Sequence, residues 1–546
     1  MITVLAVITL LAAVHVPLGN YIAHIFTSER HWRIERLVYR LGRIDPDADQ
    51  RWTVYLRSLL AFSVTGVAIL YVLLRVQGHL PYSLGHPGVP PALALNTAVS
   101  FTTNTSWQSY AGESTLGHLG LAVGLGVQGF LSVAVGIAAA IALVRGLVRR
   151  ETDRVGNFWV DVTRSCTRLM LPLALLGGLL LLTLGVIQNW HDPHMFATVA
   201  GGSQTVLGGP IASWEPVKLL SGDGGGAFNA NSAHPFENPT PITNTVEIFL
   251  MLMIPSAFPR AYGRMVGDRR QGWALAVVAA ILLGVGITAG LLTQSAHHGT
   301  VPTAVGSAVE GTEVRNGVSD SALFGVAATA SADGAADASY DSFTGLGGGV
   351  LMANMMLGEI SPGGGGSGLY ALLIVALLAV FLGGLMIGRT PEYLGKRVRR
   401  REMTFVALYT LTMPATLLIG VALAIGSHTG QSSLLNTGAH GVSEALYAVT
   451  SAANSNGSAF AGLNANTTFF NTLLAVVMLV GRYLPMVFIL ALAGAFARQK
   501  QRPETSGTLK THTLLFVALT TGVAILVSLL SFLPALALAP AADSLL

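Results

Sequence analysis

The sequence predicts an all-α membrane protein with ten transmembrane helices arranged as four similar units, plus one extra span at each end. Of its 546 residues, 52% are hydrophobic and only 11% are charged, whereas about a quarter of the residues in a soluble domain are charged. Ten apolar runs approach or exceed the roughly 20 residues that a spanning helix needs. A semi-polar stretch recurs four times between these runs, which predicts a repeat architecture.

The ten apolar runs differ in how clearly they predict a spanning helix. The first resembles a secretory signal peptide, but it lacks a basic start and a basic stretch follows it, so we interpret it as a retained span. The fifth is the shortest, and Glu247, Pro255 and Pro259 interrupt it. The runs cover residues 2–26, 54–75, 117–144, 169–187, 242–259, 273–293, 366–388, 404–426, 468–496 and 514–538.

The basic residues predict the topology. All but four of the 31 Lys and Arg residues fall in five clusters, which are Arg30–Arg57, Arg145–Arg168, Arg260–Arg270, Arg389–Arg401 and Arg498–Lys510. Because Lys and Arg concentrate on the cytoplasmic side, these clusters predict five cytoplasmic loops and both termini outside. The net charge of +4 therefore reflects topology, with lipid headgroup contact as a secondary role, and does not indicate a nucleic-acid partner.

Four semi-polar stretches occupy the long outer loops. They cover residues 92–108, 211–227, 321–337 and 444–460, and they start 119, 110 and 123 residues apart. The last two align without gaps. The same register puts four dipeptides in one column: Asn104-Thr105, Asp223-Gly224, Asp333-Gly334 and Asn456-Gly457.

This pattern predicts the domain organisation. We expect an N-terminal span and cytoplasmic loop (1–50), four repeats and a C-terminal span (511–546). The repeats cover 51–168 with a filter loop at 102–108, 169–270 with a loop at 221–228, 271–401 with a loop at 330–336, and 402–510 with a loop at 454–460.

Each repeat predicts a short helix that ends in a polar turn at membrane depth. Non-helical backbone survives there only where protein buries it or where it lines a water-filled cavity. The partly negative C-terminal ends of four such helices would favour a cation on a shared axis, and backbone carbonyls could replace its hydration shell. The predicted filter residues are Thr103, Asn104, Thr105, Gly222, Asp223, Gly224, Ala332, Asp333, Gly334, Ser455, Asn456 and Gly457. The alternative is four ordinary Gly-rich surface loops.

Long strings around these turns resemble the KdpA family, the potassium-binding subunits of the bacterial Kdp ATPases. The strings include "PLGNYIAHIF", "FTTNTSWQSY", "GGGAFNANSAHPFENPTP", "DSFTGLGGG", "GRTPEYLGK" and "NGSAFAGL". The resemblance implies the potassium-transporter superfamily fold, K⁺ as the transported ion, and the bacterial cytoplasmic membrane. It also implies a complex with a KdpB-like P-type ATPase subunit and with KdpC-like and KdpF-like small subunits.

Three positions depart from the family pattern. Asp223 and Asp333 stand where the family has neutral residues, and Gly345 stands where it has Pro. Carboxylates facing the axis would raise the field at the ion. We expect instead that both carboxylates point behind the filter and accept hydrogen bonds from backbone N–H groups.

Further residues are predicted to support the filter or to block the path below it. Gln108 follows the first turn, and Gly225 and Gly226 follow the second. Arg482 lies midway along the ninth run, where an Arg costs about 2.5–3.5 kcal/mol. We expect it to face the pore as a barrier below the filter, assisted by Arg389. The alternative is a structural ion pair with a carboxylate such as Glu247.

The motifs that the sequence lacks are equally informative. It contains no D-K-T-G phosphorylation motif, no phosphate loop of the G-x-x-x-x-G-K-[ST] type and no Cys/His cluster with metal-ligand spacing. We therefore expect no catalytic residues, no ATP site and no bound metal other than potassium. Two other interpretations stay open: a passive or ion-coupled uptake channel like Trk and Ktr, and an intramembrane enzyme.

Overall fold

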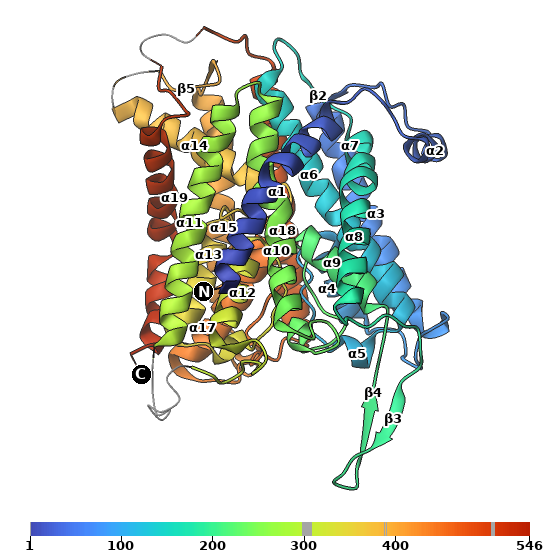
Figure 1. The fold of residues 1–546 in the computed structure, drawn as a ribbon. Helices are drawn as coiled ribbons and strands as arrows, with labels where there is room; N and C mark the ends of the chain where they lie inside the picture. Colours follow the sequence, from blue (N-terminus) through green and yellow to red (C-terminus); the bar gives the residue numbers. More distant parts are fainter. Residues whose placement is uncertain (1, 297–307, 387, 389, 504–507, 546) are drawn as a thin grey trace.

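The computed structural model describes residues 2–296, 308–386, 388, 390–503 and 508–545, and these form a helical bundle (Figure 1). Ten helical segments among them are long and apolar enough to cross a membrane, as the sequence predicts. They are Ile2–Thr27, Trp52–His79, Gly120–Val148, Phe158–Thr183, Pro241–Met265, Arg269–Ser295, Ser367–Met386, Arg400–Gly426, Thr468–Ala497 and Leu514–Ala541.

The described helices follow one another in a repeating order. The spans contain α1 (Ile2–Thr27), α3 (Trp52–Val76), α6 (Gly126–Val148), α7 (Phe158–Arg164) with α8 (Leu171–Thr183), α10 (Pro241–Met265), α11 (Arg269–Ser295), α14 (Ser367–Met386), α15 (Arg400–Gly426), α18 (Thr468–Ala497) and α19 (Leu514–Leu536). Four short helices lie between spans: α4 (Pro91–Thr102), α9 (Ile211–Ser221), α12 (Gly317–Ala330) and α17 (Gly438–Asn454). The smaller helices are α2 (Arg33–Leu41), α5 (Gly112–Thr115), α13 (Gly345–Met356) and α16 (His428–Gln431).

Strands are few among the described residues. Three antiparallel pairs occur: β1 (Gln50–Arg51) with β2 (Arg154–Gly156), β3 (His194–Ala197) with β4 (Ser203–Val206), and β5 (Glu392–Tyr393) with β6 (Lys396–Arg397). The β3–β4 hairpin, which the sequence analysis did not anticipate, projects from the same end of the bundle as the C-terminus (Figure 1).

Each short helix packs against the span that precedes it in its repeat. The pairs are α3 with α4, α8 with α9, α11 with α12, and α15 with α17. Helix α13 was not predicted. It starts at Gly345, after the Thr344 hydroxyl caps it by accepting a hydrogen bond from the Gly347 N–H at 3.0 Å. Pro, which the family pattern has at position 345, is common at the first position of a helix. In this chain, however, a Cβ on residue 345 would lie 2.8 Å from the backbone nitrogen of Ser544.

The span that contains α6 is the most deeply buried of the ten candidate spans, since 83% of the residues in its most apolar 18-residue stretch are buried. Its sequence is rich in Gly and Ala, and small residues allow neighbouring membrane helices to approach closely. It packs against α4, α9, α14 and α18, which come from all four repeats. This central helix therefore holds α4 and α9, the short helices of the first and second repeats, against spans of the third and fourth repeats.

Both chain ends lie against short helices. The Thr3 hydroxyl donates to Asp320 in the first turn of α12 at 2.9 Å. At the other end of the chain, Asp543 lies 2.9 Å from His440 Nδ1 in the first turn of α17. The termini thus share one face of the bundle, in keeping with an even number of spans.

Candidate ion-selective site

The four short helices end in turns with the same backbone geometry. One residue in each turn adopts a left-handed conformation, with φ between 59° and 61°: Asn104, Gly222, Ala332 and Ser455. The next N–H then bonds to the carbonyl five residues earlier, in the pairs Thr105–Ser100, Asp223–Lys218, Asp333–Ala328 and Asn456–Ser451. Four copies of one turn are the structural outcome of the sequence repeat.

This geometry corrects the predicted register of the first repeat by one residue. Thr105, and not Asn104, is the counterpart of Asp223, and Ser106 is the counterpart of Gly224. The N–H groups of Ser106 and Gly224 both point to the carbonyl six residues earlier. The sequence alignment missed this shift because the first turn has Ser106 where the other turns have Gly224, Gly334 and Gly457. Ser106, with φ of 54°, therefore belongs with the candidate filter residues.

The turns close into a ring through direct contacts. The first meets the second where Asn104 Nδ2 donates to the Gly222 carbonyl at 2.7 Å. The second meets the third where a Cβ on Gly222 would lie 3.0 Å from the Ser331 carbonyl oxygen. The third meets the fourth where a Cβ on Gly334 would lie 2.7 Å from the Asn456 carbonyl oxygen.

Glycine is required at the closest approaches in this ring. A Cβ on Gly224 would overlap the backbone of Gly334, and a Cβ on Gly457 would overlap the carbonyl oxygen of Thr105, which joins the fourth turn to the first. Gly224 and Gly457 also have φ of 82° and 99°, a region that side chains disfavour. The predicted filter residues are thus brought together in one closed constriction.

A hollow of about 490 Å³ lies at the mouth of this ring. The residues that follow all four turns line it, among them Ser106, Gly225, Gly334 and Gly457. Gln108 links two of its walls, because Gln108 Oε1 accepts a hydrogen bond from the Gly226 N–H at 2.8 Å. The support residues expected from the sequence therefore lie together beside the ring.

The side chains behind the third and fourth turns are bound in the expected way. Asn456 Oδ1 accepts from the Ser458 N–H at 3.1 Å, and Asn456 Nδ2 donates to the Ala328 carbonyl at 3.2 Å. Asp333 makes the equivalent of the Asn456–Ser458 bond, since Asp333 Oδ1 accepts a hydrogen bond from the Ala335 N–H at 2.9 Å. The expected backbone hydrogen bond is confirmed for Asp333.

The same expectation is wrong for Asp223. Its side chain is buried, yet within the described parts of the chain neither carboxylate oxygen has a hydrogen-bond partner. One oxygen lies against α6, 3.5 Å from where a Cβ would stand on Gly129.

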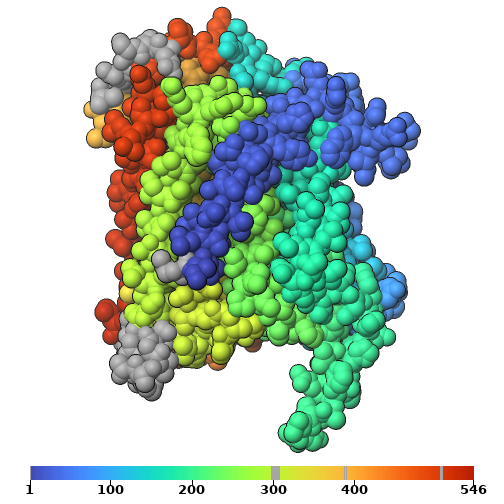
Figure 2. All heavy atoms as spheres, in the orientation of Figure 1, coloured from blue at the N-terminus to red at the C-terminus, as the bar shows by residue number. Residues whose placement is uncertain are grey.

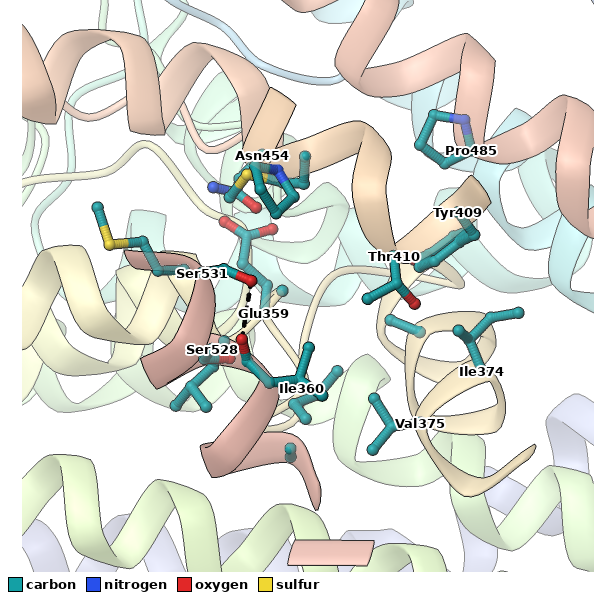
Figure 3. Close-up of a pocket in the computed structure, with 18 of the residues that line it drawn as sticks. Glu359, Ile360, Ile374, Val375, Tyr409, Thr410, Asn454, Pro485, Ser528 and Ser531 are labelled. Atoms are coloured by element: carbon teal, nitrogen blue, oxygen red, sulfur yellow. Dashed lines mark hydrogen bonds between the residues drawn. The ribbon is translucent and has the colours of Figure 1, made fainter. Parts of the chain in front are cut away.

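A second cavity, of about 130 Å³, reaches the fourth turn from the helix side of the ring. It touches Asn454 and Ser455, at the end of α17, and continues between α14, α15, α18 and α19. In Figure 3, Glu359 and Asn454 lie on one side of this cavity with Ser528 and Ser531. Ile374, Val375, Tyr409 and Thr410 lie on the other side.

Arg482 lines this second cavity and is buried in α18. Its guanidinium donates to the Ser132 carbonyl of α6 at 3.3 Å, and it has no ion pair among the residues that the structure describes. Glu247 lies instead beside Glu215 and Lys218. The alternative of an Arg482–Glu247 ion pair is therefore wrong. The second predicted barrier residue, Arg389, lies outside the described residues.

Lys218, which lies outside the five basic clusters, is a buried anchor. It lies in α9, and its ammonium contacts Glu215 at 2.5 Å and Glu237 at 3.0 Å. It also donates to Asn231 at 2.8 Å and to Ser232 at 2.9 Å. These bonds tie the second short helix to the segment that follows its own turn.

A second unforeseen cluster lies at the start of α17. Asp341, His440 and Glu444 come close enough to share a cation. However, both nitrogens of His440 already face carboxylates, Asp543 at 2.9 Å and Asp341 at 3.3 Å. This arrangement is that of an ion-paired clamp, and residues this far apart in sequence carry no spacing signal.

Comparison with known proteins agrees with this architecture. The family described as "Potassium-transporting ATPase A subunit" (KdpA) matches residues 5–545. Relatives named "Potassium-transporting ATPase potassium-binding subunit" include one from Kineococcus radiotolerans, 55% identical over 98% of this chain and 96% of its own length. Another, from Frankia alni, is 51% identical over 99% of both chains.

A solved structure, the potassium transporter TrkH from Vibrio parahaemolyticus, shares the fold. It aligns with 88% of this chain and 97% of its own, with a TM-score of 0.52 and 15% sequence identity. At this identity the likeness concerns the fold alone. Together with the family match and the close relatives, it leads to one conclusion: the chain belongs to the KdpA family.

Proposed function

We propose that this chain is the potassium-binding and translocating subunit of an ATP-driven potassium importer. The observation that carries the proposal is the closed ring of four equivalent turns, with helix C-termini behind it and a shared hollow at its mouth. We take potassium as the bound ion because the relatives are named potassium-binding subunits. The chain itself is the non-catalytic subunit, and a P-type ATPase partner hydrolyses ATP.

The filter residues follow from the ring geometry. K⁺ is held by carbonyl and hydroxyl oxygens of the four turns, as in other potassium filters. The set comprises Thr103, Asn104, Thr105, Ser106, Gly222, Asp223, Gly224, Ala332, Asp333, Gly334, Ser455, Asn456 and Gly457. Gln108, Gly225 and Gly226 hold the first and second loops in place beside it.

Arg482 then acts as a barrier on the far side of the filter. Its charge lies at the wall of the second cavity, without a carboxylate partner among the described residues. A fixed positive charge there repels a cation that leaves the filter directly. A pump needs such a block, because an open path would let accumulated K⁺ leak back. Arg389 is proposed as an assisting charge from the sequence alone.

The setting of the chain is proposed on the same basis. The five basic clusters favour the bacterial cytoplasmic membrane, with both termini outside. The partners are KdpB-like, KdpC-like and KdpF-like subunits. The repeat boundaries are those given above, 51–168, 169–270, 271–401 and 402–510, with 1–50 and 511–546 outside the repeats.

Purification of the native complex tests this function. We expect a P-type subunit to co-purify, and K⁺ to stimulate ATP hydrolysis only when that subunit is present. K⁺-stimulated hydrolysis by this chain alone would contradict the proposal. Passive K⁺ flux through the isolated chain, without a P-type partner, would favour the Trk-like or Ktr-like channel instead.

A further inference from the structure

Helix α2 (Arg33–Leu41) stands apart from the bundle. It follows α1 after a short connection and extends sideways from the end of the molecule that carries β2 and β5 (Figure 1). In the space-filling view it forms a protrusion beyond the neighbouring helices (Figure 2). The helix therefore has a surface that the rest of the described chain leaves uncovered.

One side of α2 is fixed to the bundle. Glu35 is fully buried and pairs with Arg168, whose Nη2 lies 2.6 Å from Glu35 Oε2. Tyr39, one turn later, is also buried and packs edge-on against His31. The Arg168 guanidinium lies over the ring of Trp32 at 5.0 Å. These contacts set the rotation of α2 about its own axis.

That rotation turns an apolar stripe outwards. Ile34, Leu37, Val38 and Leu41 follow the i, i+3, i+4, i+7 spacing of a single helix face. All four are exposed, from 38% for Val38 to 76% for Leu41. A continuous apolar stripe facing water would be unfavourable, so this face has an apolar neighbour that the isolated chain does not provide.

The remaining side of α2 is basic. Arg33, Arg36, Arg40 and the following Arg43 are exposed, and their side chains make no hydrogen bond or ion pair with any residue that the structure describes. Four free guanidinium groups beside an apolar stripe complement a surface with negative charge above an apolar layer. Anionic phospholipid is such a surface.

The depth of α2 fits a membrane interface. Its anchor, Arg168, is the last charged residue of the fourth span, and the following segment to Thr183 is entirely uncharged. The neighbouring helix α1 likewise carries no Asp, Glu, Lys or Arg before its end at Thr27. The helix α2 thus lies where the bundle surface changes from apolar to charged, which is the headgroup level.

We propose that α2 is an interfacial helix that inserts Ile34, Leu37, Val38 and Leu41 between anionic phospholipids and binds their phosphates with its arginines. The inference rests on the cytoplasmic orientation in the proposed function. A partner subunit is the competing occupant. Lipid is favoured because every arginine on the free side lacks a carboxylate and because the stripe lies at headgroup depth.

A single-cysteine probe tests the proposal in the purified complex. Cys166 is replaced by Ala, and an environment-sensitive fluorophore is attached to Leu41→Cys. The complex is placed in detergent, in neutral phosphatidylcholine nanodiscs, and in discs with 30% phosphatidylglycerol. We expect a blue shift and at least threefold weaker quenching by acrylamide, a neutral quencher that the lipid charge does not repel, in the anionic discs only.

Two double variants test whether the arginines of α2 are responsible for the protection. Arg36→Gln with Arg40→Gln should abolish most of the protection, because each basic residue near an anionic surface contributes about fivefold to membrane affinity. The matched control, Arg269→Gln with Arg270→Gln, changes exposed arginines in the first turn of α11 and should leave the protection intact. K⁺-stimulated ATP hydrolysis should persist in both, so a failure here is separable from a failure of the proposed function.

Two outcomes overturn the proposal. Equal quenching in detergent, neutral discs and anionic discs would show that α2 does not enter the bilayer. Protection that is already complete in detergent and insensitive to the arginine substitutions would show that a partner subunit covers the stripe.

Discussion

The second and fourth filter turns share a backbone but differ in how their side chains are bound. Both have a left-handed residue, Gly222 or Ser455, followed by an N–H bonded five residues back. In the fourth turn the Asn456 amide is bound at both ends, to Ser458 and to the Ala328 carbonyl. In the second turn the Asp223 carboxylate is buried without a partner among the described residues.

This difference separates two roles within one ring. The closed geometry comes from the backbone and from the glycines at the contact points, because it is the same in both turns. The side chain of the following residue acts behind the ring, as a tie to the neighbouring short helix. An amide can donate to a carbonyl there, whereas a carboxylate cannot, and an unpartnered buried polar group is costly.

The largest expected effect comes from breaking the backbone contact itself. In Gly457→Ala the new Cβ would collide with the Thr105 carbonyl oxygen, at a φ of 99° that Ala disfavours. We expect the apparent K⁺ affinity, measured by K⁺-stimulated ATP hydrolysis of the complex, to fall about 5- to 150-fold, since strain of about 1–3 kcal/mol has to be absorbed.

A matched glycine controls for this change. Gly284 lies in α11 with nothing within 4 Å of its Cβ position. Gly284→Ala should therefore leave affinity and selectivity unchanged. Normal affinity and normal discrimination among alkali ions in Gly457→Ala would show that the ring is not the ion site.

Removing the charge below the fourth turn should affect transport more than binding. In Arg482→Gln the guanidinium beside the second cavity is lost, while the four turns keep their contacts. We expect K⁺ affinity within about threefold of the parent, together with less uptake per ATP or a passive leak in proteoliposomes. Normal coupled uptake without a leak would show that Arg482 is structural.

A substitution that makes the fourth turn resemble the second should lower the stability of the protein. Asn456→Asp removes the donor to the Ala328 carbonyl and places a carboxylate beside an acceptor. We expect a loss of about 1–3 kcal/mol, read as a lower melting temperature of the purified complex. An unchanged melting temperature would show that the tie between the turns carries no stability.

The reverse change should have a smaller and opposite effect. Asp223→Asn replaces an unpartnered buried carboxylate with a neutral group of the same shape. We expect a gain of about 1–2 kcal/mol and a higher melting temperature. Asp337→Asn serves as the control, because that buried carboxylate lies near Asn316 and Ser321 and not in the ring. A loss of stability in Asp223→Asn would show that a partner holds the carboxylate in the complex.

The sequence was sufficient for the spans and for the position of the four turns. Span length and basic clusters are local signals, so even the interrupted fifth run was identified. The structure extends that run to Pro241–Met265, with Pro255 and Pro259 inside the helix. Neighbouring helices tolerate such prolines in a membrane bundle.

The sequence was not sufficient for features that depend on distant residues. The register of the first turn was misassigned because Ser106 replaces the glycine that marks the other turns. The Lys218–Glu237 and His440–Asp543 contacts join residues that are 19 and 103 positions apart, and no spacing rule identifies contacts over such distances. The missing partner of Asp223 likewise depends on where α6 passes behind the turn.

The smallest expected effect concerns the His440 clamp at the start of α17, since the second short helix is held by Lys218 and not by a histidine. The hydrogen bond with Asp341 and that with Asp543, opposed by partial burial, raise the pKa of His440 to about 9. Because the folded-state pKa lies above the usual value of 6.5, the clamp contributes fully below about pH 6.5, and its contribution is lost as the pH rises through about 9. A shift of this size corresponds to about 3 kcal/mol, but solvent screens this partly exposed pair, so we expect about 1 kcal/mol of stability to disappear across this window, with a lower melting temperature at pH 9.5 than at pH 6.5. His440→Gln should reduce that pH dependence, whereas His428→Gln, at the preceding helix, should preserve it. An equal pH dependence in His440→Gln and the parent would show that the clamp does not hold α17, and that the fourth turn is fixed by its ring contacts alone.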